Sequence, residues 1–273
     1  MKVKLGPAVL VTVAGVVPTV LICLGIYHLQ AHGLSAAAIS MASSMNMADM
    51  RKYWAFPILQ ASGLTGIAFA YVSVILGLMQ MGGINRPSPA AYQRLNLYHR
   101  YVSLLVVALV VIHVIATVFD AMGDSWKTVL IPGQWVQNGW PEGAFGYNLG
   151  IIATYLLLLL GPTFYVRRLV GSARWYVLHR FAAVFYVLSF WHAMVLGLDV
   201  AYYGWLRPAM WLLQIPLLVL LMVRLQAVTF RPSSDRRMLV VAICGGLLVA
   251  SAAAIVAILA LVLTGHSGFI QNV

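Results

Sequence analysis

Long apolar runs constrain the fold of this chain more than any other feature of its sequence. Seven runs are long enough to cross a bilayer, which takes about 20 predominantly apolar residues in a helix. They cover residues 5–30, 54–81, 96–119, 147–168, 174–198, 203–228 and 238–264. Only 8% of the 273 residues are charged, whereas soluble domains average about 25%. The sequence predicts an all-α integral membrane protein with about seven transmembrane helices.

The charges between the runs predict the orientation of the chain. Cytoplasmic loops of membrane proteins carry an excess of Lys and Arg. Here these residues gather in alternate connections, the first of which holds Lys2 and Lys4 and the last Arg231, Arg236 and Arg237. We therefore expect a cytoplasmic N-terminus and an external C-terminus. The net charge of +11 is explained by this asymmetry rather than by a nucleic-acid surface.

Four histidines form two pairs with similar spacing. The third run holds His99 and His113, fourteen positions apart, and the fifth holds His179 and His192, thirteen positions apart. At a rise of about 1.5 Å per residue, the separations are roughly 21 and 19.5 Å. One span lies between the two runs, so their helices are parallel. We expect His99 to face His179 near the cytoplasm and His113 to face His192 nearer the outside.

Paired imidazoles at two depths suit two haems stacked across the bilayer. Imidazole is a common axial ligand of haem iron, and ionisable residues inside a membrane are costly and usually functional. The helical phase is not ideal, because thirteen steps of about 100° leave the second histidine roughly 140° from the first. The fifth helix must tighten locally, or its two haems must approach from different directions. For each histidine alone, a hydrogen bond to a neighbouring helix is the structural alternative.

The segments that carry these histidines, "LYHRYVSLLVVALVVIHV" and "RWYVLHRFAAVFYVLSFWHAMVLG", resemble the ferric-reductase-type transmembrane domain. This is the haem module of NADPH oxidases, ferric-chelate reductases and the bacterial haem subunit that serves methionine sulfoxide reductase. The resemblance covers roughly the first six runs. It implies two haems b and electron flow from the cytoplasmic to the external face. It also implies an aromatic residue between the haems, where Phe185 lies, although core packing explains Phe185 equally well.

Four arginines are candidates for binding haem propionates, because a guanidinium can pair bidentately with a carboxylate. Arg100 and Arg180 each follow a histidine directly, and Arg174 begins the fifth run. Arg207 lies at the outer start of the sixth run and is a candidate for the outer haem. Each of them could instead be an anchor at the membrane interface.

The resemblance also predicts how the chain is organised. We expect a six-helix di-haem bundle over residues 1–228, and a basic cytoplasmic loop with an additional helix over 229–273. In the large reductases and oxidases an FAD/NADPH domain follows the sixth span, whereas here a seventh span follows. The chain is therefore expected to be the haem-binding membrane subunit of an oxidoreductase in a bacterial cytoplasmic membrane. A cytoplasmic flavoprotein or membrane quinol would be the donor, and a ferric chelate or extracytoplasmic redox protein the acceptor.

Two external connections carry further hypotheses. Thioethers suit Cu(I), and one connection contains Met41, Met45, Met47 and Met50. An amphipathic helix on the membrane surface is the alternative for that segment. The connection 120–146, with three tryptophans, is either an interfacial aromatic belt or a lid over the outer haem.

Two other classes of protein stay open on the sequence alone. One is a quinol-linked di-haem cytochrome b of another family, in which His28, His32 or His266 would be a ligand. The other is a haem-free transporter or assembly factor whose histidines bind ions or carry protons.

Overall fold

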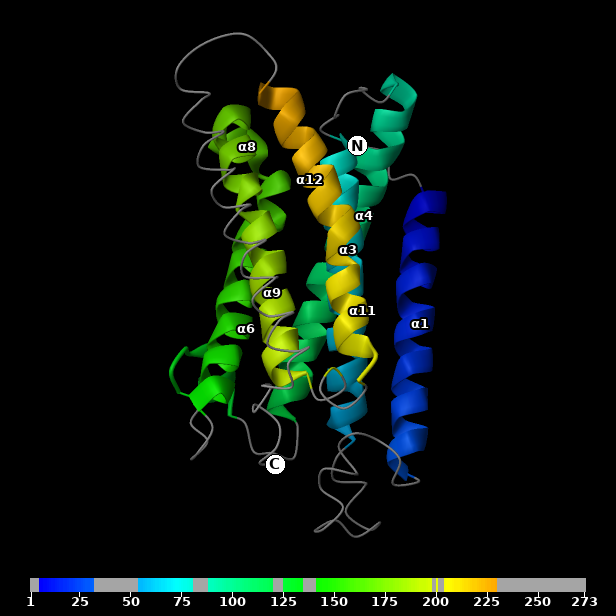
Figure 1. Ribbon diagram of the computed structural model, residues 1–273, viewed down its shortest axis with the longest axis vertical. Coiled ribbons are helices and arrows are strands. Elements are labelled where there is room, and N and C mark those ends of the chain that lie inside the picture. The colour runs from blue at the N-terminus through cyan, green and yellow to red at the C-terminus, as the bar shows by residue number, and fades with distance from the viewer. Residues whose placement is uncertain are drawn as a thin grey trace.

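The computed structural model describes residues 5–31, 54–80, 88–119, 125–134, 141–197, 200 and 204–229. These residues form helices and connections, with no strand among them. Figure 1 shows the longer helices lying side by side along one axis. The elements are α1 (Leu5–Ala31), α3 (Ala55–Gln80), α4 (Pro89–Val118), α5 (Trp126–Leu130), α6 (Pro141–Leu160), η2 (Pro162–Phe164), α7 (Arg167–Val170), α8 (Ser172–Arg180), α9 (Ala182–Leu196), α11 (Leu206–Leu212) and α12 (Gln214–Thr229).

Five helical segments are long and apolar enough to cross a membrane, which confirms the prediction of a helical multi-pass membrane protein. They are Gly6–His28, Ala55–Gln80, Pro89–Val118, Ala144–Phe164 and Arg174–Leu196. The sixth predicted run corresponds to a shorter apolar stretch, Leu206–Met222, in α11 and α12. The seventh predicted run, 238–264, lies outside the described residues. The total of seven spans and the orientation of the termini therefore stay predictions.

Helix α4 begins at Pro89, well before the apolar run that predicted it. Its first turns are polar, so hydropathy did not include them. Ser88 caps the helix by accepting a hydrogen bond from the Ala91 amide at 3.3 Å, and Pro89 occupies the first turn. Both features favour a helix start, so the helix extends beyond its apolar part.

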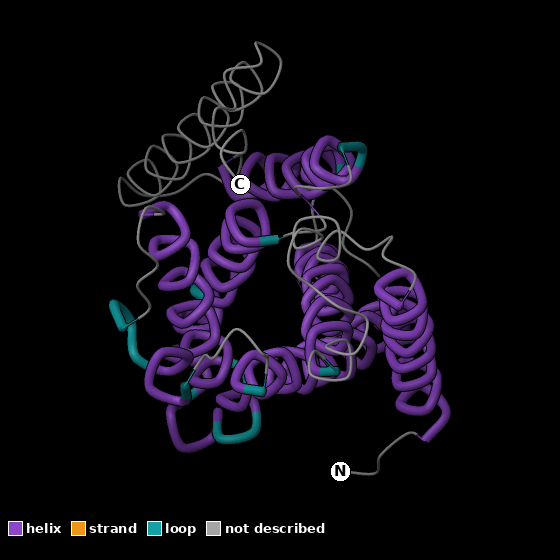
Figure 2. The backbone as a smooth tube through the Cα atoms, turned by 90° about the horizontal axis from the view of Figure 1, so that it is seen from below, coloured by secondary structure: helices purple, strands orange, loops and turns teal. Residues whose placement is uncertain are grey.

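Helix α3 is the central element of the bundle. It packs against α1, α4, α9 and α12, whereas α6 packs mainly against α9. Figures 1 and 2 show α1 at the edge of the bundle, on the opposite side from α6. Helix α4 carries His99 and His113, and α9 carries His192. These two helices pack chiefly on α3 and α6 rather than on one another.

An apolar cluster fills the middle of the bundle, between the two depths at which the histidines lie. Val106 of α4 is midway between His99 and His113, and Phe185 of α9 is midway between His179 and His192. Both side chains are buried, at 2% and 7% exposed. They pack with the other buried members of the cluster, Ala70, Ala153, Leu157 and Tyr186. The two histidine levels are thereby separated by packed side chains.

Candidate functional site

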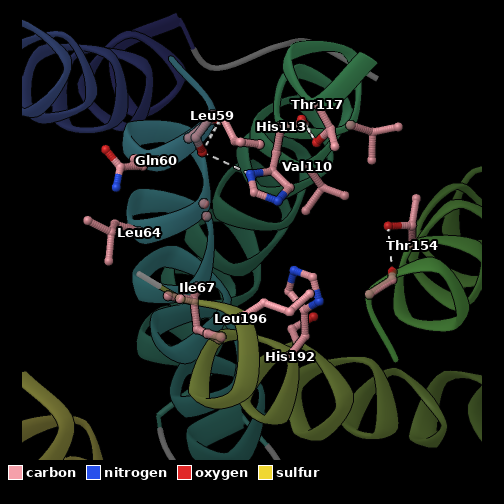
Figure 3. Close-up of a pocket in the computed structure, with 18 of the residues that line it drawn as sticks. Leu59, Gln60, Leu64, Ile67, Val110, His113, Thr117, Thr154, His192 and Leu196 are labelled. Atoms are coloured by element: carbon pink, nitrogen blue, oxygen red, sulfur yellow. Dashed lines mark hydrogen bonds between the residues drawn. The ribbon is translucent and has the colours of Figure 1, made fainter. Parts of the chain in front are cut away.

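The structure brings the four histidines together as two facing pairs. The ring centroids of His99 and His179 are 6.0 Å apart, and those of His113 and His192 are 6.2 Å apart. The ring planes within each pair are nearly perpendicular, at 82° and 88°. Figure 3 shows the rings of His113 and His192 turned toward one another across a pocket. We call the first pair the inner level and the second the outer level.

The distance within each pair fits one metal ion held from two sides. An imidazole nitrogen binds a metal at about 2.0 Å, and the ring centroid lies roughly 1.1 Å behind that nitrogen, so coaxial ligands have centroids about 6.2 Å apart. Among the described residues, no group of three or more His, Cys, Asp or Glu could hold a metal ion. Each level brings together two histidines, the number that a metal already held in a macrocycle would need from the protein.

Three of the imidazoles are fixed by a hydrogen bond to a backbone carbonyl. The Nδ1 atoms of His99, His113 and His192 each lie 2.9 Å from a carbonyl oxygen, those of Ser73, Leu59 and Gly146 respectively. Because a carbonyl only accepts, Nδ1 carries the hydrogen in each ring, and Nε2 keeps its lone pair. This arrangement is typical of histidines that bind metals, since the bond orients the ring and raises its basicity.

The fourth imidazole, His179, is held by a ring contact instead. It stacks on Trp175, one turn earlier in α8, with centroids 4.8 Å apart and an interplanar angle of 16°. Trp175 is 7% exposed, and its Nε1 atom is buried without a hydrogen-bond partner among the described residues. A buried unpaired donor costs about 1–3 kcal/mol. An acceptor atom on a group bound at the inner level would remove that cost.

The local tightening expected in the fifth span occurs at Phe181, between α8 and α9. The Phe181 amide donates to the Leu178 carbonyl at 3.0 Å, and the Val184 amide donates to the Phe181 carbonyl at 2.9 Å. Such bonds to the third preceding residue are those of a 3₁₀ turn, which rises about 2.0 Å per residue. A single turn in that conformation extends the roughly 19.5 Å rise expected between His179 and His192 to about 21 Å. The thirteen residues from His179 to His192 thus rise about as far along the helix axis as the fourteen residues from His99 to His113 on α4.

Two guanidinium groups lie against Phe164, which is linked to His179 through Trp175. The Cζ atoms of Arg100 and Arg167 lie 4.5 and 4.4 Å from the ring centroid of Phe164. Phe164 in turn contacts Trp175, with centroids 5.7 Å apart. Arg167 was not among the propionate candidates. The only feature of the sequence that could have indicated Arg167 is its position in the basic connection after the fourth run.

The other candidate arginines lie at two different places. Arg174 and Arg180 are exposed on α8, the helix that carries His179. Arg207 donates from Nη2 to the Met194 carbonyl at 3.3 Å. Met194 follows His192 closely in α9, so Arg207 is anchored near the outer level.

The outer level opens into a cavity of about 250 Å³ between α3, α4, α6 and α9. Phe185 lines it from the middle of the bundle, and Val129 of the short helix α5 lines it from the connection. Helix α5 is held by a reciprocal capping box between Ser125 and Thr128, and the Tyr155 hydroxyl donates to the Leu130 carbonyl. The described part of this connection therefore contributes Val129 to the wall of the cavity, and the choice between a lid and an aromatic belt stays a prediction.

Several sequence hypotheses concern residues outside the described part of the chain. These residues are Met41, Met45, Met47, Met50, His32, His266, Trp135 and Trp140. The copper hypothesis for the methionines stays a prediction. Among the rival haem ligands, His28 is described and lies near the end of α1.

Three residues at this site were not identified from the sequence. Gly63, Gly77 and Gly150 each lie against one of the histidine rings. The available signal was the spacing of Gly63 and Gly77 along the chain, which equals the spacing of His99 and His113. Nothing in the sequence indicated which helix would face which.

The comparisons with known proteins agree with the resemblance read from the histidine segments. The family model of the ferric reductase like transmembrane component matches residues 62–190. This range runs from α3 into α9 and ends just before His192. No curated protein and no solved structure matches the chain. Over residues 62–190, just under half of its length, the chain is therefore similar to the ferric reductase like transmembrane component.

Proposed function

We propose that this protein transfers electrons across the membrane through two bis-histidine haems b. The inner haem would be held by His99 and His179, and the outer by His113 and His192. The observation that carries the proposal is the centroid distance of 6.0 and 6.2 Å in the two pairs. Both distances suit coaxial ligands of one iron, and the carbonyl-bonded Nδ1 atoms leave Nε2 of three rings available for it.

A bound haem supplies an iron that takes up and releases one electron at a time. His99 with His179, and His113 with His192, would each hold such a group with two imidazoles, which would favour electron transfer over the binding of a small ligand. Val106, Phe185 and the side chains packed with them are buried between the levels and are mostly apolar. Since protons need polar groups or water to cross a membrane, this packing favours a path for electrons alone.

The residues around each level suit the acidic groups of a haem. Arg100 and Arg167 lie near the inner level, where the Trp175 indole offers a buried donor. Arg174 and Arg180 are the exposed candidates there, and Arg207 is the candidate at the outer level. A guanidinium binds a propionate carboxylate with two parallel hydrogen bonds.

The direction of transfer and its partners extend the proposal. Electrons enter at the inner level from a cytoplasmic flavoprotein or a membrane quinol, and leave from the outer level. The acceptor is a ferric chelate or an extracytoplasmic redox protein that contacts the surface formed by α5. The family match to a ferric reductase like component supports ferric iron as the destination. The expected location is a bacterial cytoplasmic membrane.

The test is a dithionite-reduced minus oxidised spectrum with a pyridine haemochrome count on the purified protein. The proposal requires two low-spin haems b per chain. Protein without haem after expression with sufficient haem supply would overturn it and favour an ion or proton carrier. His28→Ala is the matched control, because His28 belongs to α1 and should not change the count. Loss of a haem in that variant would instead favour a cytochrome b of another family.

A further inference from the structure

Three of the four histidine rings occupy the space where a neighbouring residue lacks a side chain. A Cβ atom built on Gly150 would lie 2.6 Å from both Cε1 and Nδ1 of His192. One built on Gly63 would lie 3.0 Å from the same two atoms of His113, and one on Gly77 would lie 3.3 Å from Cε1 of His99. The first distance is far below van der Waals contact, and the other two are tight. Each ring is therefore seated against a glycine.

The same three glycines stand in a fixed relation to the carbonyls that hold the rings. His113 donates to Leu59, His99 to Ser73 and His192 to Gly146. Each acceptor is the fourth residue before the glycine against which that ring lies. In an α-helix the carbonyl of residue i−4 already accepts from the amide of residue i. The Cβ of residue i tilts toward the helix N-terminus, so it shields that oxygen from a second donor.

We propose that Gly63, Gly77 and Gly150 are positioning residues for the axial ligands, an inference that rests on the proposed function. Each glycine exposes a helical carbonyl to an imidazole Nδ1–H and fixes the plane of the ring. The bond also selects the tautomer whose Nε2 faces the partner ring. Because it raises the basicity of the ligand, it stabilises oxidised iron and lowers the reduction potential.

The arrangement follows from the pairing of α3 with α4. The spacing of Gly63 and Gly77 along α3 equals the spacing of His113 and His99 along α4. Gly63 lies against His113 and Gly77 against His99, so the two helices run antiparallel. A single alignment of α3 with α4 therefore places a glycine against both His99 and His113.

The fourth ligand departs from this arrangement for a structural reason. On α3 the two glycines are fourteen positions apart. The same spacing counted from Gly150 leads to position 164, which lies beyond the end of α6 at Leu160. Phe164 occupies that position and contacts Trp175, on which His179 stacks. The outer level thus has two ligands seated on glycines, and the inner level has one.

Glycines in membrane helices also allow helices to pack closely, so the test must separate packing from ligand positioning. Gly63→Ala, Gly77→Ala and Gly150→Ala are compared in the purified holoprotein. Gly25→Ala is the control, because a Cβ on Gly25 of α1 meets nothing within 4 Å. The measurements are haem count, the low-spin EPR signals of the oxidised protein and the potential of each haem. His99→Ala and His113→Ala assign each signal to its level.

The expected effects are selective and graded. Gly150→Ala shifts the EPR signal of the outer haem most, Gly63→Ala shifts the same signal less, and Gly77→Ala shifts only that of the inner haem. Each weakened carbonyl bond raises the potential of the haem concerned, and Gly25→Ala changes neither. If Gly150→Ala fails to fold, the two milder variants decide.

Two results overturn the inference while the proposed function stands. In the first, Gly63→Ala and Gly77→Ala bind two haems, and their EPR signals and reduction potentials are the same as in the wild-type protein. In the second, every glycine variant loses both haems to the same extent, which is the result expected if the glycines act only through helix packing. Wild-type protein without haem overturns the proposed function itself, and the inference with it.

Discussion

The rings of His113 and His192 face one another with centroids 6.2 Å apart and planes at 88°. These residues are far apart in the chain and lie on helices that pack mainly on other partners. Their distance is close to that expected for two coaxial ligands of one metal, and the inner pair repeats it at 6.0 Å. The repetition at two depths is what distinguishes a path across the membrane from a single buried site.

Removing one ligand should remove one haem only. His99→Ala is expected to lose the inner haem and His113→Ala the outer, because the levels are separated by the packed cluster around Val106. A pyridine haemochrome count should fall from two to about one per chain in each variant. An unchanged count in either variant would contradict the assignment of that histidine.

Trp175 should affect the inner level alone. Trp175→Phe keeps an aromatic ring for stacking on His179 but removes the indole donor. We expect a shifted potential for the inner haem and an unchanged outer haem, measured by redox titration. Trp191→Phe is the matched control, since the ring contact described for Trp191 is with Trp211. Equal shifts of both haems would show that Trp175 acts through general packing.

Ser73 separates the role of a carbonyl from that of a hydroxyl. Its backbone oxygen accepts from His99 at 2.9 Å, while its hydroxyl lies 2.8 Å from that of Ser103 and 3.4 Å from Nδ1 of His99. Ser73→Ala should keep both haems and cost about 1 kcal/mol of stability, the usual contribution of one hydrogen bond. Thermal unfolding in detergent and the haem count measure the two effects. Loss of the inner haem would mean that the hydroxyl, not the carbonyl, holds the ring.

Phe185 should contribute to stability through its volume. The side chain is 7% exposed in the cluster between the levels. Phe185→Ala is expected to cost about 3–5 kcal/mol, as other large-to-small changes in packed cores do. Phe185→Leu should recover most of that loss, and both variants should bind two haems. If Phe185→Leu were as unstable as Phe185→Ala, an aromatic ring would be required there.

Loosening α5 should expose the outer level. Ser125→Ala removes the capping box of α5 and costs about 1 kcal/mol of local stability, which weakens the cover that Val129 provides. Stopped-flow oxidation of the reduced protein by a small ferric chelate should become faster. Thr12→Ala is the control, because Thr12 is exposed on α1 and bonds only within its own helix. An unchanged rate would mean that α5 does not limit access.

Much of this architecture was predictable because it depends on local properties of the chain. Hydropathy located the spans, and the fixed rise of a helix placed His99 with His179 and His113 with His192 in depth. The same arithmetic exposed a mismatch of phase in the fifth span, and the 3₁₀ turn at Phe181 reduces it, because such a turn rotates the chain by about 120° per residue instead of about 100°. The polar start of α4 was missed, since capping by Ser88 extends a helix beyond its apolar residues.

The amino-acid sequence by itself thus determined the helical membrane class, the positions of five candidate spans and the pairing of the four histidines at two levels. Only the tertiary structure decided which carbonyls orient His99, His113 and His192, that a glycine lies against each of these rings, and that His179 stacks on Trp175 instead. The reason is physical. Rise and hydropathy belong to a single helix, whereas a hydrogen bond between helices depends on which faces of α3 and α6 turn toward α4 and α9.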